Sequence, residues 1–281
     1  MSHTPGATPA AQTFGRGGVH PEPHKEATSG RAIESVPAPA EVVLPLQQHL
    51  GEPANPIVKK GELVRRGQKI ADGGATGVPL HASISGKIRP LDKRSHPTLG
   101  IAPAIAIAAD EAAGPELEYT ADPAWTSLPL ADALARIREA GIVGLGGAAF
   151  PTWRKLESAT RSAVDTLVLN GAECEPYLTS DHRLMLAWPR EIVEGALALA
   201  RIVGATRVLI GVESDKPDAI ALLRAAIGQV WAGAIEVKVA PCMARYPQGA
   251  ERQLVYATTG RVVPPRQLPA AVGVPVIAPL A

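Results

Sequence analysis

The sequence predicts an α/β fold with a mostly parallel sheet, preceded by a small all-β domain. From about residue 120 onward, apolar strand candidates alternate with segments of helical periodicity, which is typical of βαβ units. Between residues 41 and 110, short strand candidates are separated by regular glycine and proline turns, which favours a small barrel or sandwich. We therefore expect an N-terminal arm over residues 1–40, a β domain over 41–115 and an α/β domain over 120–281.

The N-terminal arm is rich in proline and glycine and has few periodic apolar positions, so we expect an extended chain. Residues 1–13 have the small, polar composition of a disordered segment. In the β domain, glycines flank a short strand candidate within residues 62–70, and residues 82–88 repeat a strand–glycine–strand rhythm. Residues 101–109 are a strongly apolar strand candidate.

This β pattern resembles the barrel-sandwich hybrid of biotinyl and lipoyl domains, which carry a cofactor on a lysine at a hairpin tip. Lys93 is the best local candidate for such a lysine. The alternative is that Lys93 is a solvated turn lysine and that the barrel is a docking or structural module.

The elements of the α/β domain follow from periodicity and from helix-breaking residues. Strands are expected over 165–170, 207–212 and 235–240, and helices over 130–140, 152–162, 181–203 (interrupted by Pro189), 217–227 and 249–258. Ligands of parallel sheets bind beyond the carboxyl ends of the strands. The segments 170–177 and 241–251 each follow a strand end, so we expect them to line one pocket.

A glycine-rich loop lies between the first two helices, Gly144-Leu145-Gly146-Gly147-Ala148-Ala149-Phe150-Pro151. Glycine lets a backbone approach a flat ligand closely, and Pro151 suits the start of a helix. The spacing matches the dinucleotide fingerprint formally, but a helix precedes the loop where the fingerprint requires a strand. The alternative is a tight connection between two helices.

Composition excludes several function classes. The formal net charge is +1 and the aromatic content is 4%, which argues against nucleic-acid binding. We expect a cytoplasmic protein, because neither an export signal nor an apolar run of transmembrane length is visible. The histidines have no metal-ligand spacing, so we expect no metal site.

Several motifs together resemble the C subunit of the Rnf electron-transport complex. They are the glycine loop, Asn170-Gly171-Ala172-Glu173-Cys174-Glu175-Pro176-Tyr177, Tyr246-Pro247-Gln248-Gly249-Ala250-Glu251, Phe14-Gly15-Arg16-Gly17-Gly18-Val19-His20-Pro21, Leu44-Pro45-Leu46-Gln47-Gln48-His49-Leu50-Gly51 and Pro79-Leu80-His81-Ala82-Ser83-Ile84-Ser85-Gly86. The resemblance runs from about Phe14 to about Val274. The middle of the chain is also similar, more distantly, to the flavin-bearing, NADH-oxidising subunit of respiratory complex I.

The resemblance implies a set of cofactor-binding residues. Glycines of the loop would cradle the flavin with an aromatic wall, a lysine would meet a flavin oxygen or phosphate, and polar residues after the strands would contact flavin or nicotinamide. These residues are Gly144, Gly146, Gly147, Phe150, Lys155, Asn170, Glu173, Glu175, Gly249 and Glu251. The carboxylates suit ribose hydroxyls and amide donors; none would be a proton-transfer catalyst, because hydride passes directly between cofactors.

Each of these assignments has a structural alternative. Glu173 and Glu175 would otherwise make turn hydrogen bonds, Lys155 would be an exposed helix lysine, and Glu251 would favour a helix N-terminus. Leu145 and Ala172 stand where the complex I relative has arginine and aspartate, which bears on NADH affinity.

The resemblance also implies a function: an electron-transport subunit that passes electrons between NAD(H) and ferredoxin through FMN. It would belong to an ion-translocating ferredoxin:NAD oxidoreductase, lie peripherally on the cytoplasmic side of the inner (plasma) membrane, and have other Rnf subunits as partners. The alternative is a non-catalytic docking or assembly subunit without flavin. Full-length relatives add cysteine runs for [4Fe–4S] clusters, which Cys174 and Cys242 cannot supply, so we expect a chain truncated before that domain.

Overall fold

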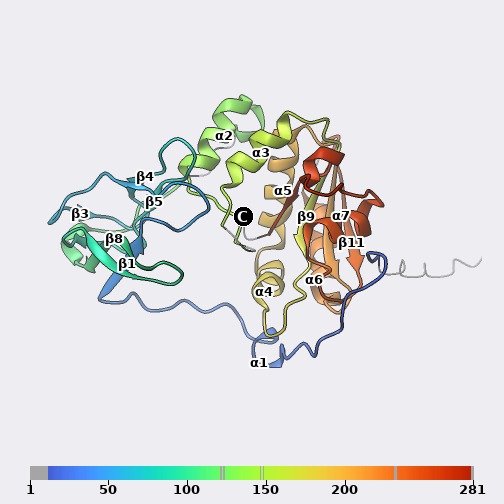
Figure 1. Ribbon diagram of the computed structural model, residues 1–281, viewed down its shortest axis with the longest axis horizontal. Helices are drawn as coiled ribbons and strands as arrows, with labels where there is room; N and C mark the ends of the chain where they lie inside the picture. The colour runs from blue at the N-terminus through green and yellow to red at the C-terminus, as the bar shows by residue number, and fades with distance from the viewer. Residues whose placement is uncertain are drawn as a thin grey trace, which may run out of the picture. The chain divides into compact units, whose positions relative to one another are not determined.

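The computed structural model describes residues 12–120, 122, 124–145, 147, 149–230 and 233–279. The chain divides into two compact units. One unit contains the N-terminal arm up to Ile33 together with the chain from Leu156 onward, and the other is Glu34–Lys155. Each unit has its own sheets (Figure 1).

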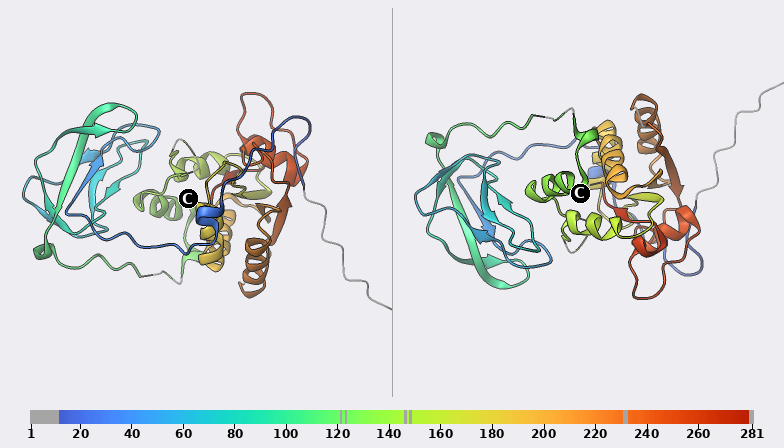
Figure 2. Two further views of the ribbon diagram at one scale, coloured as in Figure 1. Left: turned by 90° about the horizontal axis from the view of Figure 1, so that it is seen from below. Right: turned by 90° about the horizontal axis from the view of Figure 1, so that it is seen from above.

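The unit Glu34–Lys155 is built on two antiparallel sheets, drawn from two further sides in Figure 2. The larger sheet has the order β1-β8-β6-β3, with β7 also paired to β8, and the smaller has the order β2-β4-β5. The strands are β1 (Glu41–Pro45), β2 (Asn55–Pro56), β3 (Leu63–Val64), β4 (Lys69–Asp72), β5 (Leu80–His81), β6 (Gly86–Ile88), β7 (Asp92–His96) and β8 (Gly100–Ala109). The small all-β domain expected from the turn punctuation is thereby confirmed.

The core of this unit is aliphatic. Ile70, Ile88, Ile105 and Ile107 are fully buried and belong to one cluster. The ten-residue strand β8 supplies two of them, and its length lets it pair with β1, β6 and β7.

Lys93 does not lie at a hairpin tip. It stands inside β7, where it pairs with Pro103 of β8, and the hairpin turns between His96 and Gly100. Gly100 has φ +72°, a conformation suited to glycine, so the turn forms there and not at the lysine. Lys93 therefore does not occupy the hairpin-tip position that a carrier lysine would need, which leaves the docking or structural alternative for this unit.

Helical segments follow the barrel strands. They are η1 (Glu111–Ala113), η2 (Trp125–Ser127), α2 (Leu130–Glu139) and the start of α3 (Thr152–Thr160). The indole Nε1 of Trp153 donates to the carbonyl of Gly77 at 3.1 Å, and the guanidinium of Arg138 lies over the Trp153 ring. Lys69 of β4 pairs with Glu139 at 2.7 Å, so α2 is anchored on the smaller sheet.

The second unit contains a four-stranded parallel sheet with the order β11-β10-β9-β12. Its strands are β9 (Thr166–Gly171), β10 (Arg207–Glu213), β11 (Glu236–Cys242) and β12 (Val276–Ile277), and its helices are α4 (Ser180–Ala187), α5 (Pro189–Val203), α6 (Pro217–Gln229) and α7 (Glu251–Thr259), with η3 at Pro269–Val272. The predicted α/β class and its order of elements are confirmed. The break expected at Pro189 is also present, since Pro189 is the first residue of α5.

Burial explains the sequence of the central strands. Nearly every residue of β9 and β10 is buried, as expected for parallel strands covered on both faces. Val168 and Leu209 pack with Leu254 and Val255 of α7, which therefore covers their face of the sheet. Helices α4, α5 and α6 pack against one another, and α5 and α6 also pack against the strands.

The N-terminal arm belongs to the unit of the parallel sheet. Gln12 forms a parallel bridge with Cys242 at the end of β11, and Val19 forms an antiparallel bridge with Tyr246. The short helix α1 (Glu26–Ser29) follows. In the part of the chain that the structure describes, no helix combines the length and apolarity needed to cross a bilayer.

Candidate functional site

Asn170 and Gly249 join two of the predicted segments at the carboxyl end of the sheet. The side-chain amide of Asn170 donates to the carbonyl of Gly249 at 2.8 Å, and its oxygen accepts from the N–H of Ala172. A Cβ on Gly249 would lie 2.5 Å from the carbonyl oxygen of Ala172, so only glycine fits without movement. The loops after β9 and β11 therefore lie together, as their positions after two strand ends predicted.

Glu173 is a buried carboxylate with one satisfied and one unsatisfied oxygen. Glu173 is only 3% exposed to solvent. Oε1 accepts from Ser180 Oγ at 3.1 Å and from the N–H of Asp181 at 2.9 Å, at the start of α4, where a negative charge is favourable. Oε2 receives no hydrogen bond from the described residues, and Lys25 Nζ lies 3.9 Å away. One carboxylate oxygen is thus buried without a hydrogen-bond donor among the described residues.

Asp181 lies beside Glu173 and has an unusual proton affinity. Burial, together with the charges of Glu173 and Glu175, raises its pKa to about 7, although Lys216 and Lys25 oppose the shift. Its Oδ1 is buried without a hydrogen bond from any described residue. The group therefore titrates near neutral pH.

A buried ion pair lies at the end of the neighbouring strand. Lys216 Nζ donates to Glu213 Oε2 at 2.6 Å and to Asp215 Oδ1 at 3.0 Å. Burial raises the pKa of Glu213. Burial would lower the pKa of Lys216, but the charge of Glu213 and the hydrogen bond to it raise that pKa instead. The Glu213–Lys216 pair is therefore a buried pair at the end of β10, the strand between β9 and β11.

The remaining candidates of this unit lie around the same edge. Glu175 is exposed, and Glu251 is the first residue of α7 and half-buried. Cys174 is half-buried, and burial raises the pKa of its thiol, which therefore stays protonated near neutral pH. Among the predicted residues, Asn170 and Gly249 are hydrogen-bonded to each other, and Glu173 is hydrogen-bonded to the start of α4.

The glycine loop belongs to the unit Glu34–Lys155. The N–H of Gly144 donates to the carbonyl of Phe150 at 3.0 Å, and Val143 bridges to Pro151, so the loop closes on itself before α3 begins. Gly147 is exposed, and a Cβ there would meet no atom within 4 Å. Phe150 is 36% exposed, Lys155 is half-buried on α3, and Gly146 lies outside the described residues.

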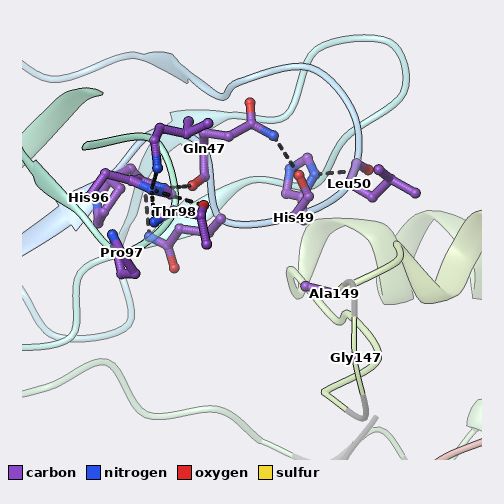
Figure 3. A pocket seen from close by; sticks show the side chains of 11 residues that line it. Gln47, His49, Leu50, His96, Pro97, Thr98, Gly147 and Ala149 are labelled. Carbon is purple, nitrogen blue, oxygen red and sulfur yellow. Dashed lines mark hydrogen bonds between the residues drawn. The ribbon is translucent and has the colours of Figure 1, made fainter. Parts of the chain in front are cut away.

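A pocket of about 620 Å³ lies beside this loop within the same unit. Figure 3 shows Gly147 and Ala149 on one side and His49 and His96 among the barrel residues on the other. The remaining lining residues are Pro45, Gln47, Gln48, Leu50, Pro97, Thr98 and Leu99. The volume is within the range of small-molecule sites.

Both pocket histidines are held by internal hydrogen bonds. His96 Nδ1 accepts from the N–H groups of Thr98 and Leu99, so its Nε2 donates to the carbonyl of Gln47 at 2.8 Å. His49 Nε2 accepts from the N–H of Val78 at 3.3 Å. These rings are therefore fixed parts of the pocket wall. No group of three or more His, Cys, Asp or Glu that could hold a metal occurs among the described residues.

The residues present fit a flavin and a nucleotide. The open face of Gly147 allows a planar ligand to approach the backbone, and the pocket beside it has adequate volume. In the other unit, Glu173 Oε2 is a buried acceptor in need of a donor. Ribose hydroxyls and ring amides are such donors.

Comparison with known proteins places these features in a family. Residues 137–278 match the family model described as the Nuo51 FMN-binding domain, and residues 13–112 match the RnfC barrel sandwich hybrid domain. The chain belongs to the RnfC family. The barrel-sandwich resemblance predicted for the β domain is confirmed by the second match.

Curated relatives belong to the same family. The chain is 40% identical over 262 residues to the C subunit of the proton-translocating ferredoxin:NAD(+) oxidoreductase complex of Clostridium ljungdahlii, covering 92% of this chain and 56% of the relative. It is 41% identical over 265 residues to the Na(+)-translocating counterpart of Acetobacterium woodii, covering 93% and 58%. The chain thus spans little more than half the length of these RnfC relatives.

A solved structure, an NAD+-reducing [NiFe]-hydrogenase in the H2-reduced state, aligns with a TM-score of 0.49 and 24% identity, over 55% of this chain and 29% of that one.

Sequence reasoning missed four charged residues around this edge: Lys25, Asp181, Glu213 and Lys216. Lys25 is 148 positions from Glu173, and no local pattern connects them. The position of Glu213 at the end of a strand offered a signal, because strand ends form the ligand edge of a parallel sheet.

Proposed function

We propose that this RnfC chain binds FMN and passes electrons between NAD(H) and ferredoxin as a subunit of an ion-translocating ferredoxin:NAD oxidoreductase. The observation that carries the proposal is the match of residues 137–278 to an FMN-binding domain, because that range contains both the glycine loop and the loops after β9 and β11. The names of the two relatives supply the reaction. Other Rnf subunits would be its partners, on the cytoplasmic side of the membrane.

The proposed ligand-binding residues fall into two groups. The glycine loop offers Gly144, Gly146, Gly147 and Phe150 to the flavin, and Lys155 to a flavin oxygen or phosphate. Asn170, Glu173, Glu175, Gly249 and Glu251 are proposed to contact flavin or nicotinamide portions of the ligands. When bound, FMN supplies the ability to take up two electrons and release them singly.

Within its own unit, Glu173 has the clearest role. Its Oε1 is engaged by the start of α4, which fixes the carboxylate, and its Oε2 is buried without a donor among the described residues, so a ligand donor would satisfy it. A hydrogen bond to a charged group contributes roughly 1.5–3 kcal/mol. Water is largely excluded from this carboxylate because the residue is buried.

FMN titration of the full chain tests the proposal. Quenching of flavin fluorescence should report saturable binding, and Glu173→Gln should weaken it about tenfold while keeping the fold, since Gln retains an oxygen for Ser180 and Asp181. Glu194→Gln on α5 is the control, because the Glu194 side chain is 42% exposed and pairs with Arg190 one helical turn away. A folded chain that does not bind FMN would support the docking alternative.

A further inference from the structure

The N-terminal arm reaches the loops at the carboxyl end of the parallel sheet at several points. Gln12 hydrogen-bonds to the chain at Pro241 and Met243, and Val19 exchanges two backbone hydrogen bonds with Tyr246. Further along, Lys25 contacts the loop after β9. The arm therefore runs along the edge at which ligands of such sheets bind.

Lys25 inserts its ammonium group into the loop that carries Glu173. Nζ donates to the carbonyl of Glu173 at 2.6 Å and to the carbonyl of Leu178 at 2.7 Å, and Glu173 Oε2 lies 3.9 Å away. The Lys25 side chain is only 14% exposed. Burying an ammonium is costly unless it is paired, and here two carbonyls and one carboxylate compensate it.

Neighbouring arm residues hold the same loop. The N–H of Tyr177 donates to the carbonyl of Pro23, and the His24 ring stacks on the Tyr177 ring at 5.1 Å. Thr179 Oγ1 donates to Thr28 Oγ1 at 2.8 Å. Arg183 of α4 donates to the carbonyl of Ser29. Residues 23–29 thus fix the loop 173–179 at both of its ends.

We propose that Lys25 is a positioning residue of the ligand site, which holds the Glu173 carboxylate and the loop 173–178 in place to accept a hydroxyl or amide donor of the bound flavin or dinucleotide. The inference rests on the proposed function for the identity of the ligand. Lys25 does not act on the reacting atoms. It acts through Glu173, whose Oε2 faces its charge without receiving a hydrogen bond from the described residues.

The charge of Lys25 also acts on the neighbouring carboxyl group. Asp181 is surrounded by the negative charges of Glu173 and Glu175 and by the positive charges of Lys216 and Lys25. The first two charges raise the pKa of Asp181 and the last two lower it. Removing the Lys25 charge should therefore raise that pKa further.

The test compares three variants of the full chain. Lys25→Met keeps an unbranched side chain of similar length and removes the charge, and Lys25→Arg keeps the charge. The control, Lys238→Met, removes an exposed lysine that pairs with Glu236 on the same sheet. FMN affinity is measured by fluorescence quenching, the titration of Asp181 by carboxyl NMR, and the exchange of the Tyr177 and Asp181 amides by hydrogen exchange.

We expect Lys25→Met to weaken FMN binding about tenfold, to raise the Asp181 titration midpoint and to speed exchange at both amides. Lys25→Arg should restore the midpoint and most of the affinity, and Lys238→Met should change none of the three. A folded Lys25→Met chain with wild-type FMN affinity would overturn the proposal. So would a Lys25→Arg chain that matched Lys25→Met in every measurement, because the charge would then have no role.

The wild-type chain separates this inference from the proposed function. If wild type does not bind FMN, the proposed function fails, and the NMR and exchange data still decide whether Lys25 fixes the loop. Unchanged amide exchange and an unshifted Asp181 midpoint in Lys25→Met would then contradict the positioning role itself.

Discussion

At the scale of single residues, the carboxyl end of the parallel sheet concentrates buried charge. Glu173, Glu213 and Lys216 are each at most 3% exposed, and Asp181 lies beside Glu173. Buried charges are tolerated only when partners compensate them, and these are compensated by helix α4, by one another and by the arm. Burying so many charged groups lowers the stability of the fold, and clusters of this kind are typical of ligand-binding sites.

Asp181 makes the stability of the chain depend on pH near neutrality. Its folded pKa of about 7 is raised above the ordinary value of 3.8. The protonated group therefore contributes its full stability below pH 4, and this contribution is lost as pH rises through 7. Asp181→Asn removes the titration, so its gain in unfolding free energy over wild type should grow from pH 5 to pH 8, reaching about 2–4 kcal/mol.

Urea unfolding at the two pH values measures this gain. Asp132→Asn on α2 is the control, because Asp132 is exposed and its substitution should change stability by less than about 0.5 kcal/mol at either pH. A gain for Asp181→Asn that is equal at pH 5 and pH 8 would contradict the raised pKa.

Lys216 should be far more important for stability than an exposed lysine in an equally close pair. Lys216→Met leaves Glu213 buried without its partner and should cost about 3–5 kcal/mol of unfolding free energy. Lys238→Met breaks the exposed pair with Glu236 and should cost less than about 1 kcal/mol. Chemical denaturation of both variants decides the matter, and equal losses would show that the Glu213–Lys216 pair is not buried in solution.

At the scale of elements, the loops after β9 and β11 depend on one close approach. Gly249→Ala would push a Cβ to within 2.5 Å of the carbonyl oxygen of Ala172, so one of the two loops must move. We expect a loss of about 1–3 kcal/mol and weaker FMN binding. Gly228→Ala on α6 is the matched control, because its Cβ would meet no atom and alanine favours helix by about 1 kcal/mol.

Denaturation midpoints compare these two variants directly. A Gly249→Ala chain as stable as wild type would show that the loops are not packed as described.

The sequence predicted most elements of the parallel-sheet unit, because β9 and β10 are continuous apolar runs and α5 begins at a proline. It did not predict the charged contacts around these elements. Lys25 and Glu173 meet only after the chain has folded, and their separation of 148 positions leaves no local signal. Lys93 is a different case, because its local sequence was misleading. The charged stretch around it has the composition of a turn, but it forms the solvent-exposed strand β7.

At the scale of the whole molecule, the two units have separate hydrophobic cores. The barrel unit buries an aliphatic cluster around Ile70 and Ile105, and the sheet unit buries one around Val168 and Leu254. The period of the apolar residues distinguished the two fold classes in the sequence. Which residues share a ligand was predicted by resemblance to the family, since fold alone does not determine function.

The most direct test of the proposed function is an anaerobic visible spectrum of the FMN-loaded full chain, recorded before and after addition of NADH. We predict that NADH bleaches the flavin absorbance, and that Glu173→Gln reduces the extent or rate of bleaching while Glu194→Gln does not. Bound FMN whose spectrum NADH leaves unchanged, in a chain shown to be folded, would contradict electron exchange with NAD(H).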